Sequence, residues 1–466
     1  MLREMRFGAL KGAPLTTSDP NDDGGAGQAR PQVAPPRPEP DAAERRFRTF
    51  DSLIDVPAFR WYMLSQVGNQ SAQLMQMVVR GFLAYQLTGS FAALGLVELA
   101  AAGPRVFLAL YGGVVADRAS RRVIIQVGQL LNATLAAVLA ALLFADMLHF
   151  GHLIVGSLVT GVLNSFIMPA RQSMIPEIVG TQRVMNAFAL NAFGMNMLRL
   201  GAPALAGFLI ATVGSGWVFA LMAGLYVFAM ATLFQVPKTN AASRAAAAGG
   251  AAARPTGHGH APSRSGMREI KQALVYLRGQ PILVTLLVLH CLIGMLALPY
   301  QRLLPGFVDE VLSGGHPDRT AILMGLLLSF TAVGALAGSL LIASLPSRNR
   351  GKLLIASLVI FAIGLFAFSA STTFWLSAGI VIVLGVGQAG RQSLIQILIQ
   401  SYVSDEYRGR ISSIIVLEDG IESLGIFFIA LLAQAFGPQL ALGAVAITLG
   451  SLAAWMWSTR SIRELQ

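Results

Sequence analysis

Residues 353–390 read LLIASLVIFAIGLFAFSASTTFWLSAGIVIVLGVGQAG and contain no charged side chain over 38 positions. A helix needs about 20 apolar residues to cross the roughly 30 Å hydrocarbon core of a bilayer, so this stretch is long enough for two crossings. Residues 369–372, Ser-Ala-Ser-Thr, lie near its middle and predict a turn. Because backbone polar groups in lipid must be hydrogen-bonded within the segment, both crossings are expected to be helical. The stretch therefore predicts a helical hairpin inside a membrane.

Comparable apolar runs extend outward from this stretch, and the first begins at Phe59. Of the 466 residues, 55% are hydrophobic and only 12% are charged, against about 25% charged residues in a typical soluble protein. This composition excludes an ordinary soluble enzyme and predicts an all-α integral membrane protein. We expect twelve transmembrane helices, at residues 59–86, 90–116, 122–145, 150–171, 184–211, 216–236, 281–307, 320–344, 352–369, 373–394, 410–435 and 438–458.

Changes in composition divide the chain into parts. The N-terminal stretch is rich in Pro, Gly, Asp and Arg and lacks apolar periodicity, which is typical of disorder. The segment between the sixth and seventh spans is rich in Ala, Gly, Ser and Pro, which is typical of a flexible linker. We therefore expect a disordered cytoplasmic tail at 1–57, a six-helix bundle at 58–236, a cytoplasmic linker at 237–279, a second six-helix bundle at 280–458 and a short cytoplasmic tail at 459–466.

An internal repeat supports the division into two bundles. Residues 170–175 read ARQSMI at the end of the fourth span, and residues 390–395 read GRQSLI at the end of the tenth span. Both copies end an even-numbered span on the same side of the membrane, so the two bundles are expected to be parallel repeats.

Basic residues mark one side of the membrane. Loops after even-numbered spans, together with the C-terminal tail, carry 18 Lys and Arg residues, whereas the opposite loops carry one, Arg319. By the positive-inside rule, both termini are expected in the cytoplasm. Elsewhere the basic residues stand singly or in twos and threes between apolar runs, so no nucleic-acid-binding face is expected.

Polar residues form a stripe on the first span. Their spacings of 3, 4, 3 and 4 place five side chains on one helical face: Gln66, Asn69, Gln73, Gln76 and Arg80. Gln388 begins a similar stripe on the tenth span. Such stripes either line a hydrated cavity or hydrogen-bond neighbouring helices, and we favour a cavity between spans one and ten. Spans three, six, nine and twelve contain no charged residue apart from Arg122 and Lys352 at the first position of spans three and nine, and they are expected to face lipid.

Charged residues inside the spans mark a second set of candidates. Arg80 lies nine residues before Gly89 and Glu98 nine residues after it, so at about 1.5 Å per residue the two reach similar depths and can pair. The pair is either static or a titrating gate, because burying one charge alone would be costly. Arg105, near the middle of the second span, is a candidate for the cavity wall, and Arg199, near the middle of the fifth span, is a candidate for proton coupling or charge pairing.

Three carboxylates lie together on the eleventh span, namely Glu418, Asp419 and Glu422. Like charges at this spacing raise one another's pKa, so one of them is a candidate proton carrier. The alternative is that they neutralise Arg105 or Arg199 across the two bundles.

The chain lacks the residue patterns that ATP hydrolysis, metal binding and nucleophilic catalysis require. No G-x-x-x-x-G-K-[ST] phosphate loop occurs, the chain has a single cysteine, and no His, Cys and Asp cluster offers metal or nucleophilic chemistry. We therefore expect neither enzymatic activity nor a cofactor or metal, and an ion gradient or the substrate's own gradient remains as the energy source.

The second loop, residues 113–122, reads GVVADRASRR. Asp117 at a helix end can pair with basic residues or a helix N-terminus of the opposing bundle and so latch one conformation. The loop resembles the signature loop of the major facilitator superfamily, G-x-x-x-D-R-x-G-R-[RK], except for Ser120 where glycine is usual. The resemblance assigns gating to Gly113, Asp117, Arg118, Arg121 and Arg122.

Other blocks resemble a particular branch of that superfamily. Residues 201–207 are similar to its antiporter motif, with Ala202 in place of the usual glycine, although small residues there also permit close helix packing. Residues 85–90, 169–172 and 404–410 resemble the enterobactin-exporter-like drug:proton antiporter branch. The resemblance covers about residues 59–457. It implies that spans 1, 4, 7 and 10 line a central cavity and that spans 2, 5, 8 and 11 form the interface between bundles.

The combined hypothesis is a bacterial inner-membrane secondary transporter that works by alternating access as a monomer. It would export a small amphipathic molecule, of the drug or siderophore class, in exchange for protons. Two alternatives stay open: an uptake symporter, and a non-transporting sensor or scaffold that recruits a partner through its N-terminal tail.

Overall fold

The computed structural model describes residues 51–180, 183–237, 276–345, 349–404, 407 and 418–465. Most of the predicted tail and linker therefore lies outside the described residues. Residues Asp51–Asp55, which the tail prediction placed in disorder, form the short helix α1. Asp55 at its end lies 3.1 Å from Arg183, and the guanidinium of Arg60 hydrogen-bonds the carbonyl oxygens of Leu53 and Ile54. These contacts hold the segment against the helices that follow.

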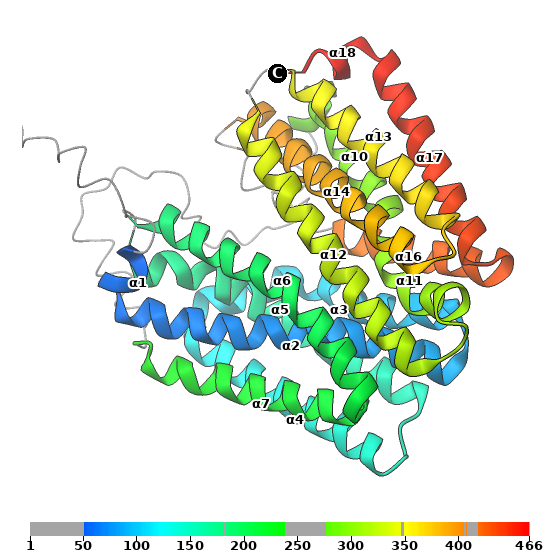
Figure 1. Cartoon of the computed structure of the whole chain (residues 1–466). Helices are drawn as coiled ribbons and strands as arrows, with labels where there is room; N and C mark the ends of the chain where they lie inside the picture. Colours follow the sequence, from blue (N-terminus) through cyan, green and yellow to red (C-terminus); the bar gives the residue numbers. More distant parts are fainter. Residues whose placement is uncertain are drawn as a thin grey trace, which may run out of the picture. The chain divides into compact units, whose positions relative to one another are not determined.

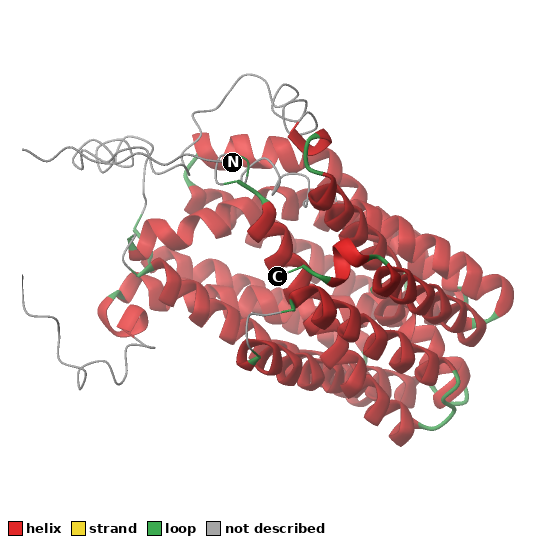
Figure 2. Ribbon diagram, turned by 90° about the horizontal axis from the view of Figure 1, so that it is seen from above, coloured by secondary structure: helices red, strands yellow, loops and turns green. Residues whose placement is uncertain are grey.

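All regular structure in the described residues is helical (Figure 2). A first group, called the N-group below, consists of α2 Pro57–Thr88, α3 Phe91–Arg118, α4 Arg121–Phe144, α5 Phe150–Val179, α6 Val184–Val213 and α7 Ser215–Thr232. A second group, the C-group, consists of α10 Pro281–Ala297, α11 Pro299–Phe307, α12 Pro317–Ser344, α13 Arg350–Ser369, α14 Phe374–Tyr402, α16 Glu418–Phe436 and α17 Pro438–Ser458 (Figure 1).

These helices lie where the twelve spans were predicted. Within the described residues, ten helical segments are long and apolar enough to cross a membrane. The other two positions are occupied by α2, which carries the polar stripe, and by α16, whose apolar part covers only Gly420–Phe436. The all-helical membrane fold is thus confirmed.

The seventh predicted span is not one continuous helix. The α-helix α10 ends at Ala297 and α11 begins at Pro299, followed by a π-helical turn, η3 Val308–Leu312. Proline lacks the backbone N–H that would continue the hydrogen-bond ladder, which explains the break. As a result, Gln301 and Arg302 project from a short helix of their own.

Large apolar side chains are exposed on α4, α7, α13 and α17, the four helices at the spans expected to face lipid. Examples from the four helices are Val127, Phe228, Ile363 and Trp457. Exposed apolar surface of this extent is expected where a protein meets lipid.

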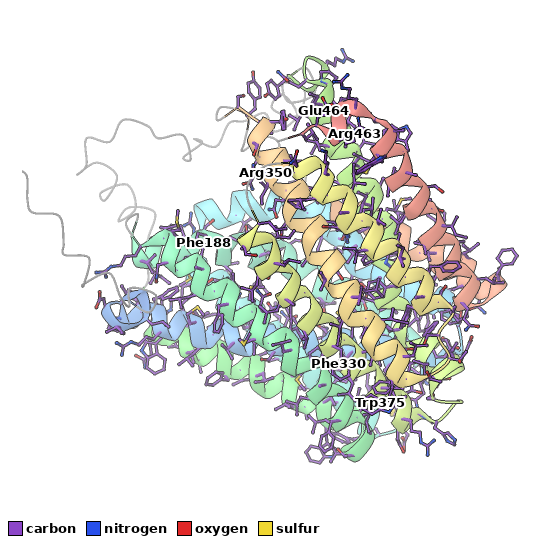
Figure 3. The ribbon with its side chains drawn as sticks, turned by 45° about the horizontal axis from the view of Figure 1, so that its top comes forward. Phe188, Phe330, Arg350, Trp375, Arg463 and Glu464 are labelled. Atoms are coloured by element: carbon purple, nitrogen blue, oxygen red, sulfur yellow. The ribbon has the colours of Figure 1, made fainter. Side chains whose placement is uncertain are left out.

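The N-group and the C-group meet along two helix pairs, α3 with α16 and α6 with α12. Glycine permits the close approach at each pair. A Cβ atom at Gly207 would collide with the backbone carbonyl of Ala321, and one at Gly325 would meet the carbonyl of Pro203. Figure 3 shows side chains along both helices, from Phe188 near the start of α6 to Phe330 on α12. Small residues thus hold α6 and α12 together near the end of one and the start of the other.

Candidate functional site

A cavity of about 450 Å³ lies between the two groups of helices. Five elements line it: α2, α6, the α10–α11 break, α12 and α14. The lining residues are Leu74, Met77, Asn196, Arg199, Pro203, Leu298, Gln301, Arg302, Leu328, Thr331, Ala332, Ala335, Ser339, Gln388, Ala389, Gln392 and Ser393. A cavity of this size falls within the range for small-molecule sites, about 300–1,000 Å³.

The close packing of α6 and α12 ends the cavity on one side. Pro203 and Leu328 belong to its lining. Gly207 lies four residues after Pro203 on α6, and Gly325 lies three residues before Leu328 on α12. In the other direction the lining continues to Asn196 on α6 and to Ser339 on α12. The cavity thus lies toward the start of α6, the side on which the basic loops predict the cytoplasm.

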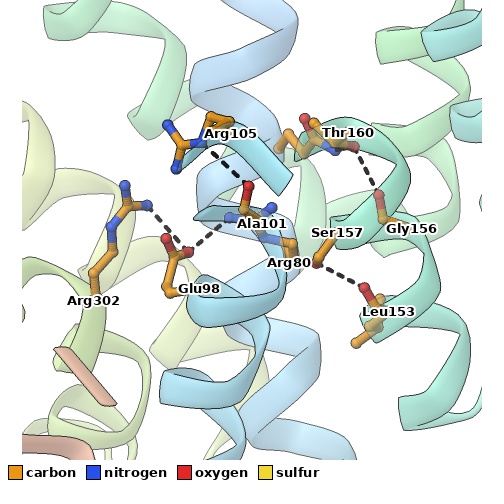
Figure 4. Close-up of polar contacts among 10 residues, drawn as sticks. Arg80, Glu98, Ala101, Arg105, Leu153, Gly156, Ser157, Thr160 and Arg302 are labelled. Carbon is orange, nitrogen blue, oxygen red and sulfur yellow. Dashed lines mark hydrogen bonds and ion pairs between the residues drawn. The ribbon is translucent and has the colours of Figure 1, made fainter. Parts of the chain in front are cut away.

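Charged residues of both groups meet beside the cavity (Figure 4). The Glu98 carboxylate is 2.7 Å from Arg80 on α2 and 3.4 Å from Arg302 on α11, and Glu98 is only 8% exposed. The depth argument predicted the pair with Arg80. The second arginine was not predicted as a partner, because Arg302 is 204 positions further along the chain. Glu98 therefore links an N-group arginine to a C-group arginine.

Arg105 and Glu422 lie around this cluster. The Nε atom of Arg105 donates to the Ala101 carbonyl at 3.2 Å, and its charge acts on Glu98. Glu422 is close enough to Arg302 for their charges to interact. The side chains of Glu418 and Asp419 lie outside the described part of the structure, so the predicted carboxylate cluster is represented here by Glu422.

Further polar contacts join the groups beyond the closed end of the cavity. The Tyr85 hydroxyl donates to Glu310 at 2.6 Å. The side-chain oxygen of Gln434 accepts hydrogen bonds from the Ser90 hydroxyl at 2.9 Å and from the Phe91 backbone N–H at 2.7 Å. Sequence reasoning missed Glu310 and Gln434 because polar residues near helix ends are common and carry no distinctive pattern.

The polar stripe of α2 is turned mainly into the N-group. Asn69 accepts a 2.7 Å hydrogen bond from Gln129 on α4, and Gln76 donates to Thr160 on α5 at 3.2 Å. Asn69 and Gln76 are 2% and 9% exposed, so the expectation that these two line the cavity is wrong. Polar side chains on α4 and α5 satisfy them instead.

The remaining stripe residues also contact neighbouring helices. Gln73 donates to Asn164 at 3.3 Å, Gln66 accepts from Arg171 at 2.7 Å, and Arg80 pairs with Glu98. None of the three belongs to the cavity lining of this structure. The contribution of α2 to the lining comes from Leu74 and Met77, on another part of its surface.

Gln388 and Arg199, in contrast, lie on the cavity wall as lining residues. Gln388 accepts hydrogen bonds from the Tyr300 hydroxyl and from the Gln301 amide, each at 3.1 Å. The stripe that begins at Gln388 therefore continues into the cavity, with Gln392 exposed on the next turn.

Sequence reasoning also missed two buried arginines, Arg171 and Arg391, which are 4% and 5% exposed. Arg171 on α5 donates to Gln66 and to the Ser65 hydroxyl at 3.3 Å. Arg391 on α14 lies over the ring of Phe361, 5.5 Å from its centre. The repeated ARQS and GRQS strings contained the signal, but they indicated only a duplication.

The predicted gating loop contacts its own group of helices through its described side chains. Arg121 lies 3.2 Å from Glu177 on α5, and Arg122 hydrogen-bonds the Val236 carbonyl and lies over the ring of Phe234. A Cβ atom at Gly113 would meet no other atom within 4 Å. The side chains of Asp117 and Arg118 are not among those that the structure describes, and a latch through them stays a prediction.

Comparisons with known proteins agree with this architecture. Residues 52–465 match the family model described as transmembrane secretion effector, of the major facilitator superfamily. The chain is 22% identical over 351 residues to the staphyloferrin A transporter of Staphylococcus aureus (strain NCTC 8325 / PS 47), covering 74% of this chain and 81% of that protein. It is 24% identical over 378 residues to the uncharacterized MFS-type transporter YfiS of Bacillus subtilis (strain 168), covering 77% and 82%.

Solved structures show the same fold. A bacterial homolog of the human lysosomal transporter Spinster, in an inward-facing and unoccupied conformation, aligns with a TM-score of 0.65 at 13% identity over 88% of this chain and 97% of that one. A D-xylose–proton symporter aligns with a TM-score of 0.61 at 13% identity, covering 88% and 97%. The resemblance drawn from the 113–122 loop is confirmed: the chain belongs to the transmembrane secretion effector family of the major facilitator superfamily, a family of multi-pass membrane transporters.

Proposed function

We propose that the chain is a proton-coupled exporter of small amphipathic molecules, of the drug or siderophore class, in a bacterial inner membrane. The N-group and C-group act as two bundles, at 58–236 and 280–458, that rock against each other around the cavity. The observation that carries the proposal is a cavity lined by both groups and ended on one side by the α6–α12 contact. Alternating access requires such a site, with one end closed at a time.

Glu98 is the first candidate proton carrier, and the two arginines beside it favour its ionised form in this state. Its carboxylate links Arg80 of the N-group to Arg302 of the C-group. An outward-open state requires the groups to separate beyond the cavity, which breaks the contact with Arg302. Protonation of Glu98 removes its negative charge and so weakens that contact. Proton binding would thereby favour outward opening, and Glu422, whose charge interacts with Arg302, is the second candidate.

The test measures proton movement in proteoliposomes that hold an imposed pH gradient, over a panel of siderophores and lipophilic drugs. Wild type is compared with Glu98→Gln, Glu422→Gln and the control Glu464→Gln, an exposed residue paired with Arg460. We expect substrate-dependent dissipation of the gradient in wild type and in Glu464→Gln, and its loss in Glu98→Gln.

Two results would contradict the proposal. Substrate movement without proton movement in wild type would exclude proton coupling. Dissipation unchanged in both Glu98→Gln and Glu422→Gln would exclude these two carriers.

The same vesicles separate export from uptake, because the direction of substrate flux under a fixed gradient differs between an antiporter and a symporter. Deleting residues 1–50 tests the sensor or scaffold alternative. A transporter keeps its flux without the tail, whereas a scaffold loses its output.

A further inference from the structure

We propose that the cavity selects amphipathic substrates that carry a carboxylate or similar oxyanion, and that Arg199 binds this anionic group. The inference rests on the proposed function for the role of the cavity as the transport site. It adds the chemical group that the site would bind and the residue that would bind it.

The charges of the cavity wall support the assignment. Among the residues that the structure describes, the lining contains two arginines, Arg199 and Arg302, and no acidic residue. The charge of Arg302 is already balanced in part by Glu98 at 3.4 Å. Arg199 is exposed to the cavity and makes no ion pair or hydrogen bond with any side chain that the structure describes. Within the described part of the wall, Arg199 is therefore a cation without a partner of opposite charge.

An uncompensated cation at membrane depth is costly and typically marks a substrate or ion site. The planar guanidinium of arginine matches a carboxylate through two parallel hydrogen bonds. Asn196 lies three residues before Arg199 on the same face of α6, where its amide can hydrogen-bond the same group. A cationic substrate would instead meet two arginines and no carboxylate among the described lining residues.

The rest of the wall suits an amphipathic molecule. Leu74, Met77, Leu298 and Leu328 provide apolar surface on the α2 and α11–α12 side. Gln388 on α14 provides an amide opposite α6. An apolar body can thus lie against the leucines while the anionic end reaches Arg199.

The test measures binding to the full-length protein in lipid nanodiscs by calorimetry. Three probes share one naphthyl group: 1-naphthaleneacetate, its neutral amide 1-naphthaleneacetamide, and the cation 1-naphthylmethylamine. Each is titrated into wild type, Arg199→Gln, Arg199→Lys and the control Arg319→Gln, a matched change at an exposed arginine near the start of α12. Thermal unfolding checks that all variants are folded.

We expect wild type and Arg319→Gln to bind the acetate about tenfold or more tightly than the amide or the amine, which corresponds to one charge-assisted contact. Arg199→Gln should abolish this preference, and Arg199→Lys should retain part of it. Equal affinities for the three probes, preference for the amine, absence of acetate binding to wild type, or an unchanged preference in Arg199→Gln would overturn the inference.

The two experiments can contradict the anion site and the proposed function independently. Anion preference without proton-coupled flux would remove the proposed function and leave the anion site. Proton-coupled flux without anion preference would retain the function and remove the anion site.

Discussion

The polar stripes of α2 and α14 have similar helical spacing and different surroundings. On α2, Asn69 and Gln76 are buried and hydrogen-bonded to α4 and α5. On α14, Gln388 and Gln392 face the cavity. A periodic polar face therefore does not by itself indicate water or substrate beside it.

The neighbouring helices explain the difference. Where α2 meets α4 and α5, those helices present Gln129, Asn164 and Thr160 as hydrogen-bond partners. Where α14 meets α13, that helix presents the apolar Phe361 to Arg391. The α2 amides therefore stabilise the N-group, whereas on α14 Gln388 is hydrogen-bonded to Tyr300 and Gln301 at the cavity wall and Gln392 is exposed to the cavity.

The largest expected effect comes from the last member of the α2 stripe. Arg80→Leu would leave buried Glu98 with one close arginine, and losing one partner of a buried ion pair typically costs about 3–5 kcal/mol. Thermal unfolding in one fixed detergent measures the loss. Arg319→Leu, at an exposed position near the start of α12, is the control and should change stability little. Equal effects of the two changes would show that the stripe contributes no buried ion pair.

The second change acts on the close contact between α6 and α12, which ends the cavity beside the α14 stripe. Gly207→Ala would push a methyl group against the Ala321 carbonyl, so we expect α6 and α12 to separate at a cost of about 1–3 kcal/mol. Gly201→Ala on the same helix has open space and should be neutral. Labelling of cysteines introduced near the Gly207 contact, with Cys291 first replaced, measures the opening. Equal labelling of the two variants would contradict close packing of α6 against α12 at Gly207.

The third change breaks one hydrogen bond of the α2 stripe. Asn69→Leu leaves the Gln129 amide without its 2.7 Å partner, and we expect a loss of about 0.6–1.7 kcal/mol, the range measured for polar contacts between membrane helices. Adding Gln129→Leu should recover part of the loss, because both polar groups are then removed. Thermal unfolding of the single and double variants shows whether the effects add, and strict additivity would argue against a hydrogen bond.

The smallest stability effect is expected on the α14 stripe. Gln392→Leu replaces an exposed cavity side chain and should change stability by less than about 0.5 kcal/mol. Substrate binding, measured by the same titrations as for Arg199, should change instead. A stability loss as large as that of Asn69→Leu would show that the two stripes play the same structural role.

Much of the fold could be read from local sequence features. The apolar runs located the helices, and the positions of Arg80 and Glu98 around Gly89 predicted their contact at 2.7 Å. The break at Pro299 was missed, because the apolar run continues through it. Of the residues expected on the cavity wall, Gln388 lines the cavity and Asn69 and Gln76 do not. Arg199 also lines it, although it was expected to pair with or carry charge.

Composition and periodicity determined the properties that depend on residues close in the chain: the helices, the pairing of Arg80 with Glu98 across a short turn and the polar face of α2. Only the tertiary structure decided what each face meets. Glu98 contacts Arg302 and Tyr85 contacts Glu310 across more than 200 positions of sequence. Such contacts depend on how two bundles pack, and a helical period specifies a direction around one helix but not the helix that lies in that direction.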